Sequence, residues 1–281
     1  YLWDGEFFGS NFYGVGFSTS SELNGVNSNG GGDILFVKYD TDGNLIWTKL
    51  LGTSSSENGL SVSTSSDGSI YITGYSRGDL GGETNSGSSD VFLSKYNSDG
   101  VNQWTKLLGT DLSDRSYGVL AASDGSIYIA GPSGGDLGGE TNSGSNDVFI
   151  AKYSSSGILQ WSKLIGSTEN DGMHYGSLKE APDGTIYLAG NTSGDLNSET
   201  NNGGRDGFLI SFGSIGSTTL HTEWVQPYAA MQNIGLKSIH NNRDLVLAKA
   251  GECNNYGWVI GDTDYCVYTN AKNKVSYVNG D

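Results

Sequence analysis

The sequence predicts an all-β protein, and in particular a five-bladed β-propeller built from four-stranded antiparallel blades. Two observations carry this prediction. Short runs rich in Val, Ile, Tyr, Phe and Trp alternate with turn residues along the chain, and no segment keeps a helical period. These runs also recur in tandem at intervals of 57 to 59 residues, and tandem units of four strands are typical of propeller blades.

The repeat is clearest in its opening strand. Apolar runs begin at four aspartates that are 57, 57 and 59 residues apart: Asp33, Asp90, Asp147 and Asp206. The run 91–96 is apolar on nearly every residue, so we expect this strand to be buried on both faces. A tryptophan segment follows each run as the second strand, at Trp47, Trp104, Trp161 and, more weakly, Trp224.

Two further strands complete each unit, and the last contains runs such as Ile70-Tyr-Ile72. Asp-Gly pairs separate the strands, because Asp-Gly supplies the positive φ angles of tight hairpins. They lie at 42–43, 67–68, 99–100, 124–125 and 183–184. The loop from Gly78 to Ser88 recurs letter for letter from Gly135 to Ser145. Each unit therefore reads as four antiparallel strands.

Counting strands gives five blades. The N-terminal residues carry only the last half of a unit, and the C-terminal residues only the first half. The predicted boundaries are half-blades at 1–32 and 264–281 and blades at 33–89, 90–146, 147–205 and 206–263. We expect the two half-blades to pair into one blade and close the ring, because closure removes exposed sheet edges. The alternative is a fragment of a larger ring.

The order Asp-x-Phe-x-x-Lys-Tyr, Asp-Gly-x-x-x-Trp-Thr-Lys and Asp-Gly-Ser-Ile-Tyr-Ile-x-Gly resembles the bacterial SBBP β-propeller repeats. The resemblance is strong over residues 11–212 and fades from Gly213 onward. It implies a secreted or cell-surface protein with seven blades, whereas this chain supplies five. The family carries no defined catalytic residues, so the resemblance implies none here.

Charge excludes some partners. Acids number 31 and bases 15, which gives a net charge of −16. Nucleic acid is therefore not expected as a partner, since phosphates need Lys or Arg. No run approaches the roughly 18 apolar residues that cross a membrane, so no membrane insertion is expected. The sequence opens at Tyr1 without a signal segment, which favours a mature product, an excised domain or a partial chain. The expected location is extracellular or on a cell or virion surface.

Two cysteines lie near the C-terminus, Cys253 and Cys266. In an oxidising compartment we expect them to form a disulfide, which would stabilise the fold by about 3 kcal/mol on the chain-entropy estimate. The alternative is a pair of free buried thiols.

The longer loops predict the binding face. Loops that leave the tryptophan strand and loops that precede the next opening strand share one end of the sheets, opposite the Asp-Gly hairpins. They are rich in Asp, Glu, Asn, Ser, Thr and Gly, which suit sugar hydroxyls or a hard cation. The predicted ligand-binding residues are Glu57, Asn58, Asp114, Arg115, Glu169, Asn170 and Asp171.

Repeated acids and amides in the loops before the opening strands make Ca²⁺ the candidate cofactor, because oxygen ligands suit this cation. The alternative is that these residues cap their own turns. Their spacing differs from the EF-hand loop, and Asp40-Thr-Asp-Gly-Asn44 copies only its opening, within a hairpin. The predicted metal ligands are Asp79, Glu83, Asn85, Asp90, Asp136, Glu140, Asn142, Asp147, Asp195, Glu199, Asn201 and Asp206.

Two further sets of side chains recur with the repeat. The tryptophans are candidate sugar platforms, or they fill the gap between neighbouring blades, since each holds the same strand position: Trp47, Trp104 and Trp161. The lysines pair with acids between blades or line an axial channel: Lys38, Lys95 and Lys152.

We expect the chain not to be an enzyme. A glycosidase needs two carboxylates in different environments, whereas the near-copied blades give their acids near-equivalent surroundings. Repeated equivalent sites instead favour multivalent binding. The divergent stretch 213–281 is the place for a unique site, and its acids are Asp244, Glu252, Asp262 and Asp264.

The predicted function is an extracellular, multivalent recognition or scaffold propeller that binds glycans or surface proteins through repeated polar loops. One alternative is a structural module of a surface layer, adhesin or virion fibre, in contact with copies of itself or with neighbouring chains. The other is a glycosidase-like five-bladed propeller.

Overall fold

The computed structural model describes residues 1–213, 221–227, 245–249 and 265–269, with backbone alone in the last three ranges. The chain divides into two compact units, Tyr1–Val225 and Gln226–Asp281. The described residues form β-strands and no helix, so no helix among them is long and apolar enough to cross a membrane. The predicted all-β class is confirmed for this part of the chain.

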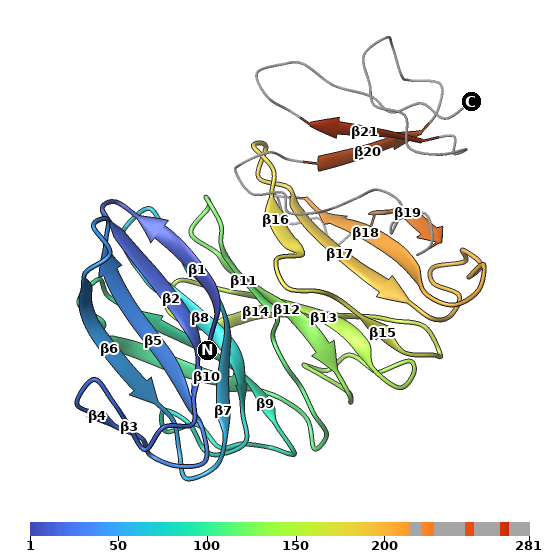
Figure 1. Cartoon of the computed structure of the whole chain (residues 1–281). Coiled ribbons are helices and arrows are strands. Elements are labelled where there is room, and N and C mark those ends of the chain that lie inside the picture. The colour runs from blue at the N-terminus through green and yellow to red at the C-terminus, as the bar shows by residue number, and fades with distance from the viewer. Residues whose placement is uncertain (214–220, 228–244, 250–264, 270–281) are drawn as a thin grey trace. The chain divides into compact units, whose positions relative to one another are not determined.

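The first unit contains four antiparallel sheets (Figure 1). The first has the order β1-β2-β5-β6, with strands Leu2–Phe8, Asn11–Ser18, Asp33–Asp40 and Leu45–Leu51. The second is formed by β7 to β10, with strands Glu57–Thr64, Ile70–Ser76, Asp90–Tyr96 and Asn102–Leu108. The third is formed by β11 to β14, with strands Gly118–Ala121, Ile127–Ser133, Asp147–Tyr153 and Leu159–Ile165.

The fourth sheet differs in its first strand, which is split in two. Both β15 (Asp171–Gly172) and β16 (Leu178–Glu180) pair with β17 (Ile186–Thr192), which is followed by β18 (Asp206–Phe212) and β19 (His221–Pro227). A small hairpin, β3 (Glu22–Leu23) and β4 (Val26–Asn27), lies between β2 and β5 in the chain. In the second unit, β20 (Leu245–Lys249) pairs with β21 (Tyr265–Thr269).

The sheets are out of phase with the sequence repeat. The predicted blade 33–89 contributes β5 and β6 to the first sheet and β7 and β8 to the second. The reason is that the loop before each opening strand stays within a sheet, as the pairing of Ser76 with Asp90 shows. The chain crosses to the next sheet only after the tryptophan strand. The predicted blade boundaries are corrected accordingly, by half a repeat.

This phase also corrects the predicted closure. Strands β1 and β2 pair with β5 and β6 and thereby complete the first four-stranded sheet. They are not a half-blade that waits for the C-terminal strands. The described residues show four sheets of four or five strands and the small hairpin β3-β4 in the first unit, and the pair β20 and β21 in the second, so a closed ring of five blades stays a prediction.

The opening strands form the core, as predicted. In β9, Val91, Phe92 and Leu93 are at most 1% exposed. Successive side chains of a strand point to opposite faces. Accordingly, Phe92 packs in the cluster that contains Phe36 of the first sheet, whereas Leu93 packs in the cluster that contains Phe149 of the third. The sheets are therefore stacked face to face through alternate residues of their buried strands.

Polar side chains join neighbouring sheets at their inner edge strands. Asp4 of β1 accepts hydrogen bonds from the Ser61 hydroxyl (2.8 Å) and the Val62 amide (3.0 Å) of β7. In turn, the amide of Ala121 in β11 donates to the Ser63 hydroxyl (3.1 Å). These bonds satisfy amides of edge strands that would otherwise be open to pairing with another chain.

The repeated tryptophans and lysines also join sheets. A Cβ at Gly100 would lie 3.0 Å from the Trp47 ring, and one at Gly157 would lie 3.0 Å from the Trp104 ring. Each of these tryptophans thus fills the space under the hairpin of the next sheet, which confirms the gap-filling alternative. Lys38 and Lys95 donate to carbonyls one repeat further on (3.0 and 3.3 Å), whereas Lys152 pairs with Asp124.

Several predictions concern residues that the structure does not describe. Cys253 lies outside the described ranges, and Cys266 lies in β21, whose side chains are not described. The disulfide therefore stays a prediction. The acids of the proposed unique site also lie outside the described residues: Asp244, Glu252, Asp262 and Asp264.

Candidate functional site

The predicted long loops meet at one end of the sheets. Each loop before an opening strand is joined by a parallel bridge to the loop that leaves a tryptophan strand, at Gly32 and Ser56, Ser89 and Ser113, and Asn146 and Asn170. We call this the loop end. The structure confirms that the two kinds of loop share it, opposite the Asp-Gly hairpins.

The acids of the repeated loops close their own turns. Asp79 accepts a hydrogen bond from the amide of Asn85 (2.9 Å), and the Asn85 side chain donates to the carbonyl of Ser76 (2.9 Å). The same pair of bonds recurs at Asp136 and Asn142 and at Asp195 and Asn201. Glu83 forms an ion pair with Lys106, and Glu140 with Lys163, while Glu199 lies in the equivalent turn.

No group of three or more His, Cys, Asp or Glu side chains is placed to hold a metal ion within the described residues. The carboxylates and amides of the repeated loops are instead used as Asx-type caps, which was the alternative weighed for them. Calcium binding by these loops stays a prediction without support from their geometry.

Three of the four opening aspartates lie in buried pairs: Asp33 with Glu57, Asp90 with Asp114 and Asp147 with Asp171. Asp33, Asp90, Asp147 and Asp206 are at most 1% exposed, and so are Glu57, Asp114 and Asp171. Burial, together with the neighbouring Asp114, raises the pKa of Asp90, and burial with Asp171 does the same for Asp147. Asp90 and Asp147, which were predicted to bind a cation, are therefore buried next to Asp114 and Asp171, which were predicted to bind a ligand.

Each pair is tied into the adjoining loops. Asp90 accepts from the amide of Ser86 (2.7 Å), and Asp114 accepts from the amide of Thr110 (2.7 Å) and from the Ser133 hydroxyl. The Oδ1 atom of Asp90 has no hydrogen-bond partner. A Cβ at Gly109 would lie 2.3 Å from that atom, which explains why a glycine follows directly after β10.

The exposed part of the loop end is aromatic. Trp3 and Tyr175 are 50% and 55% exposed, and their rings are nearly parallel (9°) with centroids 6.5 Å apart. Phe17 lies parallel to Trp3 at 6.1 Å, and Tyr117 lies 4.8 Å from Tyr175. We call these four residues and Tyr75 the aromatic cluster.

Two of the predicted ligand-binding residues lie beside this cluster. The Trp3 indole donates to Asn58 Oδ1 (3.1 Å), and the Arg115 guanidinium lies 4.9 Å from the centre of the Tyr75 ring. Burial and the neighbouring Tyr117 raise the pKa of Tyr175, while Arg115 acts in the opposite direction. The arrangement offers an apolar platform with an amide and a cation at its side.

The other predicted ligand-binding residues are placed differently. Glu57, Asp114 and Asp171 belong to the buried pairs, and Asn170 accepts a hydrogen bond from Asn146 (2.9 Å). Glu169 is exposed at the loop end.

The aromatic cluster was missed in the sequence because most of its members do not recur. One signal points to it: the third interval between opening aspartates is 59 residues rather than 57, and the two extra residues lie between Asp171 and Ile186, in the segment that carries Tyr175. This segment also splits the first strand of the fourth sheet into β15 and β16. The change in repeat length thus marks the segment in which the loop end of the fourth sheet differs from that of the other sheets.

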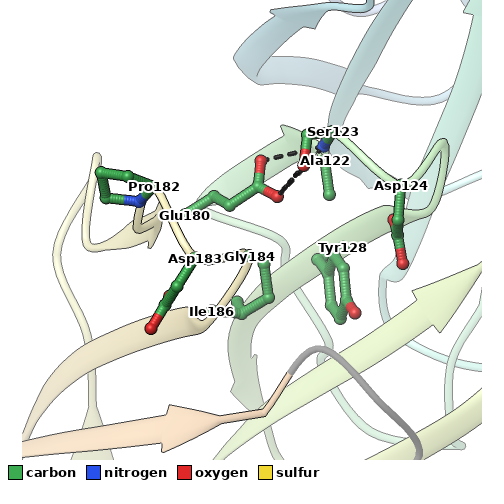
Figure 2. Close-up of a pocket in the computed structure, with 9 residues that line it drawn as sticks. All are labelled: Ala122, Ser123, Asp124, Tyr128, Glu180, Pro182, Asp183, Gly184 and Ile186. Carbon is green, nitrogen blue, oxygen red and sulfur yellow. Dashed lines mark hydrogen bonds between the residues drawn. The ribbon is translucent and has the colours of Figure 1, made fainter.

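A second candidate is a pocket of about 230 Å³ between hairpins of the third and fourth sheets (Figure 2). Its carboxylates are engaged. Glu180 accepts from the Ser123 amide (2.9 Å), and Asp124 accepts from Ser126 and Lys152. Burial acts to raise the pKa of Asp124, but these hydrogen bonds lower it overall, and the Thr185 amide lowers the pKa of Asp183. Neither aspartate has the raised pKa of a general acid.

No family model matches the chain. Over 166 residues it is 30% identical to the regulatory protein FlaEY of Caulobacter vibrioides. Over 198 residues it is 25% identical to an uncharacterized WD repeat-containing protein of Acanthamoeba polyphaga mimivirus. The alignments cover 54% and 59% of this chain but only 17% and 14% of these relatives. The SBBP resemblance therefore stays a prediction.

Two similar solved structures are propeller-like enzymes. A xylan β-1,4-xylosidase from Bacillus halodurans aligns over 78% of this chain and 42% of its own, at 18% identity and a TM-score of 0.43. A native arabinanase of Bacillus subtilis aligns over 76% of this chain and 72% of its own, at 14% identity and a TM-score of 0.40.

This finding corrects the prediction that the chain is not an enzyme, because both structures are named as glycosidases. The argument from near-equivalent blades also fails on the structure itself. The fourth sheet and the aromatic cluster show that the described blades are not equivalent at the loop end. The likeness transfers neither a substrate nor a catalytic residue to this chain.

Proposed function

We propose that this chain binds carbohydrate, with a sugar ring packed on the aromatic cluster at the loop end. The observation that carries the proposal is the exposed, nearly parallel pair of rings of Trp3 and Tyr175. Exposed apolar side chains gathered in one place are a usual mark of a binding site. Sugars suit such a platform because their C–H faces pack on aromatic rings.

Polar neighbours support the same ligand class. Binding sites combine an apolar surface with a few polar groups that orient the ligand. Asn58 and Arg115 supply an amide and a guanidinium beside the rings, and both can bind sugar hydroxyls.

The proposal changes the predicted mode of binding. Multivalent recognition was expected from repeated polar loops, but most of the acids in those loops are used in turns, ion pairs and buried pairs. The aromatic cluster is formed mostly from residues that do not recur, among them Trp3 and Tyr175. We therefore propose one carbohydrate-binding site, at the aromatic cluster, in a protein that acts in the extracellular space or at a cell surface.

The test is binding of neutral and acidic oligosaccharides measured by calorimetry. We expect Trp3→Ala and Tyr175→Ala each to weaken binding about tenfold, which corresponds to about 1.4 kcal/mol. Phe7→Ala is the matched control, because Phe7 lies on the same strand as Trp3 and is 64% exposed but does not belong to the aromatic cluster. Equal loss in all three variants, or no binding by the unaltered chain, would overturn the proposal.

A further inference from the structure

Arg115 is an unpaired cation at the aromatic cluster of a strongly acidic chain. The described residues form three ion pairs, all made by lysines: Lys106–Glu83, Lys152–Asp124 and Lys163–Glu140. The guanidinium of Arg115 takes part in none of them and lies over the ring of Tyr75. Several other cations of the described residues also form no ion pair, so what sets Arg115 apart is its position at the aromatic cluster.

We infer that the aromatic cluster selects a sugar that carries an anionic substituent, a carboxylate or a sulfate, and that Arg115 binds this group. The inference rests on the proposed function and names its ligand class. A planar guanidinium presents paired N–H donors that match two oxygens of one anion. A sugar ring on Trp3 and Tyr175 supplies the apolar contact, and its anionic group supplies the charge.

The backbone holds Arg115 in place for this role. Its amide donates to the carbonyl of Pro132 in β12 (3.1 Å). A Cβ at Gly131 would lie 1.9 Å from the Arg115 carbonyl oxygen, so the two strands approach as closely as glycine permits. The Tyr75 ring then supports the guanidinium from one face through a cation–π contact.

Neighbouring acids are held away from Arg115. Asp114, the preceding residue, is buried and accepts from Thr110 and Ser133. Glu57 is buried and accepts from the amide of Thr53 (2.7 Å). Asp4, on the strand of Trp3, accepts from Ser61 and Val62. The carboxylates nearest in sequence to the cluster are thus committed to the framework, which leaves the guanidinium open to an external anion.

The experiment compares three probes by calorimetry: tri-galacturonate, its methyl ester and a sulfated galactose trisaccharide. The acid and its ester share the same rings and differ in charge. We expect the unaltered chain to bind tri-galacturonate at least about tenfold more tightly than the ester. Arg115→Gln should abolish this difference while binding of the ester persists. Arg115→Lys should keep part of it, because the charge remains but the paired donors are lost.

Arg77→Gln is the matched control. Arg77 is exposed, and its amide donates to the carbonyl of Ser56 in a loop of the same end, so the substitution removes the same charge from a neighbouring place. It should leave the difference between acid and ester unchanged. Thermal unfolding of each variant checks that the fold is intact.

The outcomes separate the two proposals. Equal affinity for all three probes, or a preference for a charged probe that survives in Arg115→Gln, overturns the inference about charge while the proposed carbohydrate binding stands. Preference for the sulfated probe over tri-galacturonate identifies sulfate as the anion, and the reverse identifies the carboxylate. Failure of all three probes to bind the unaltered chain overturns both proposals.

Discussion

The buried acid pairs and the aromatic cluster lie at the same end of the sheets, yet they follow opposite rules. The acid pairs recur with the repeat and are closed to solvent, with Asp90 and Asp147 at most 1% exposed. The aromatic cluster occurs once among the described residues and is open, with Trp3 and Tyr175 about half exposed. The comparison teaches that in this chain repetition marks the framework, whereas departure from it marks the surface that can bind.

The largest effect should come from breaking the framework at its core. Phe92 has no exposed surface and packs between the second sheet and the first. Replacing it by Ala should lower the free energy of unfolding by about 3–5 kcal/mol, because the truncation leaves a cavity. Chemical denaturation measures this. Phe7→Ala, at an exposed position, should change stability by less than about 0.5 kcal/mol, and a similar loss in both variants would contradict the assignment.

The second prediction concerns the glycines that lie against the buried acid pairs. Gly109→Ala should destabilise the fold by about 1–3 kcal/mol, the usual range for overpacking, since the added Cβ would lie 2.2 Å from Asp90 Cγ. Gly118→Ala is the control, because its Cβ would meet nothing closer than 3.6 Å. Thermal unfolding of the two variants compares them directly. If both are tolerated alike, the acid pair does not require glycine.

The acid pairs also predict a pH dependence. Burial raises the pKa of Asp90 in the folded protein, so the folded state holds this proton more tightly than the unfolded state. The stabilisation is present below the ordinary Asp pKa of about 4 and is lost as pH rises through the raised pKa. Asp90→Asn should therefore gain stability relative to the unaltered chain as pH rises from 4 to about 7.

Denaturant unfolding at several pH values tests this difference. Asp67→Asn is the contrasting variant, because the Ser65 hydroxyl and the Ser69 amide lower the pKa of Asp67 to about 2. Its carboxylate contributes stability above about pH 4 that is lost as pH falls, so Asp67→Asn should lose relative stability as pH rises. If the stability of both variants relative to the unaltered chain changed with pH in the same direction, the contrast between buried acid pairs and exposed turn caps would be wrong.

The smallest effect should come from the repeated surface ion pairs. Glu140 and Lys163 are 34% and 40% exposed in their side chains, so solvent screens their attraction. Glu140→Gln should cost no more than about 0.2–1 kcal/mol, as judged from thermal unfolding at low salt. The cost should shrink further at high salt. A loss as large as that of Gly109→Ala would show that these loops belong to the framework as fully as the acid pairs do.

Much of the fold was readable from the sequence, because strand patterns and Asp-Gly turns are local signals. The burial of 91–96, the shared loop end and the gap-filling position of Trp47 and Trp104 followed from residue type and repeat position. The phase of the sheets did not follow. The sequence shows the length of the repeat, but this length does not tell at which residue one sheet ends and the next begins. Only the pairing of strands reveals which loop stays within a sheet.

The binding surface was harder to predict for a related reason. Trp3, Tyr117 and Tyr175 are far apart in the sequence and meet only where the inner edges of the first, third and fourth sheets converge. Asn58 and Arg115 were predicted as ligand-binding residues because they lie in polar loops, and the structure places both beside the cluster. Asp114, the immediate neighbour of Arg115, was predicted with the same reasoning and is buried instead.

The half-repeat offset between sequence units and sheets has an evolutionary consequence. The loop before each opening strand lies within a sheet, so loss of one repeat by recombination between two such loops joins β7 and β8 to β13 and β14 and leaves a four-stranded sheet at the junction. The identical stretches 78–88 and 135–145 are the kind of homology at which such exchanges occur. Such an exchange changes the number of sheets in a single genetic step, without an intermediate that exposes an unpaired strand.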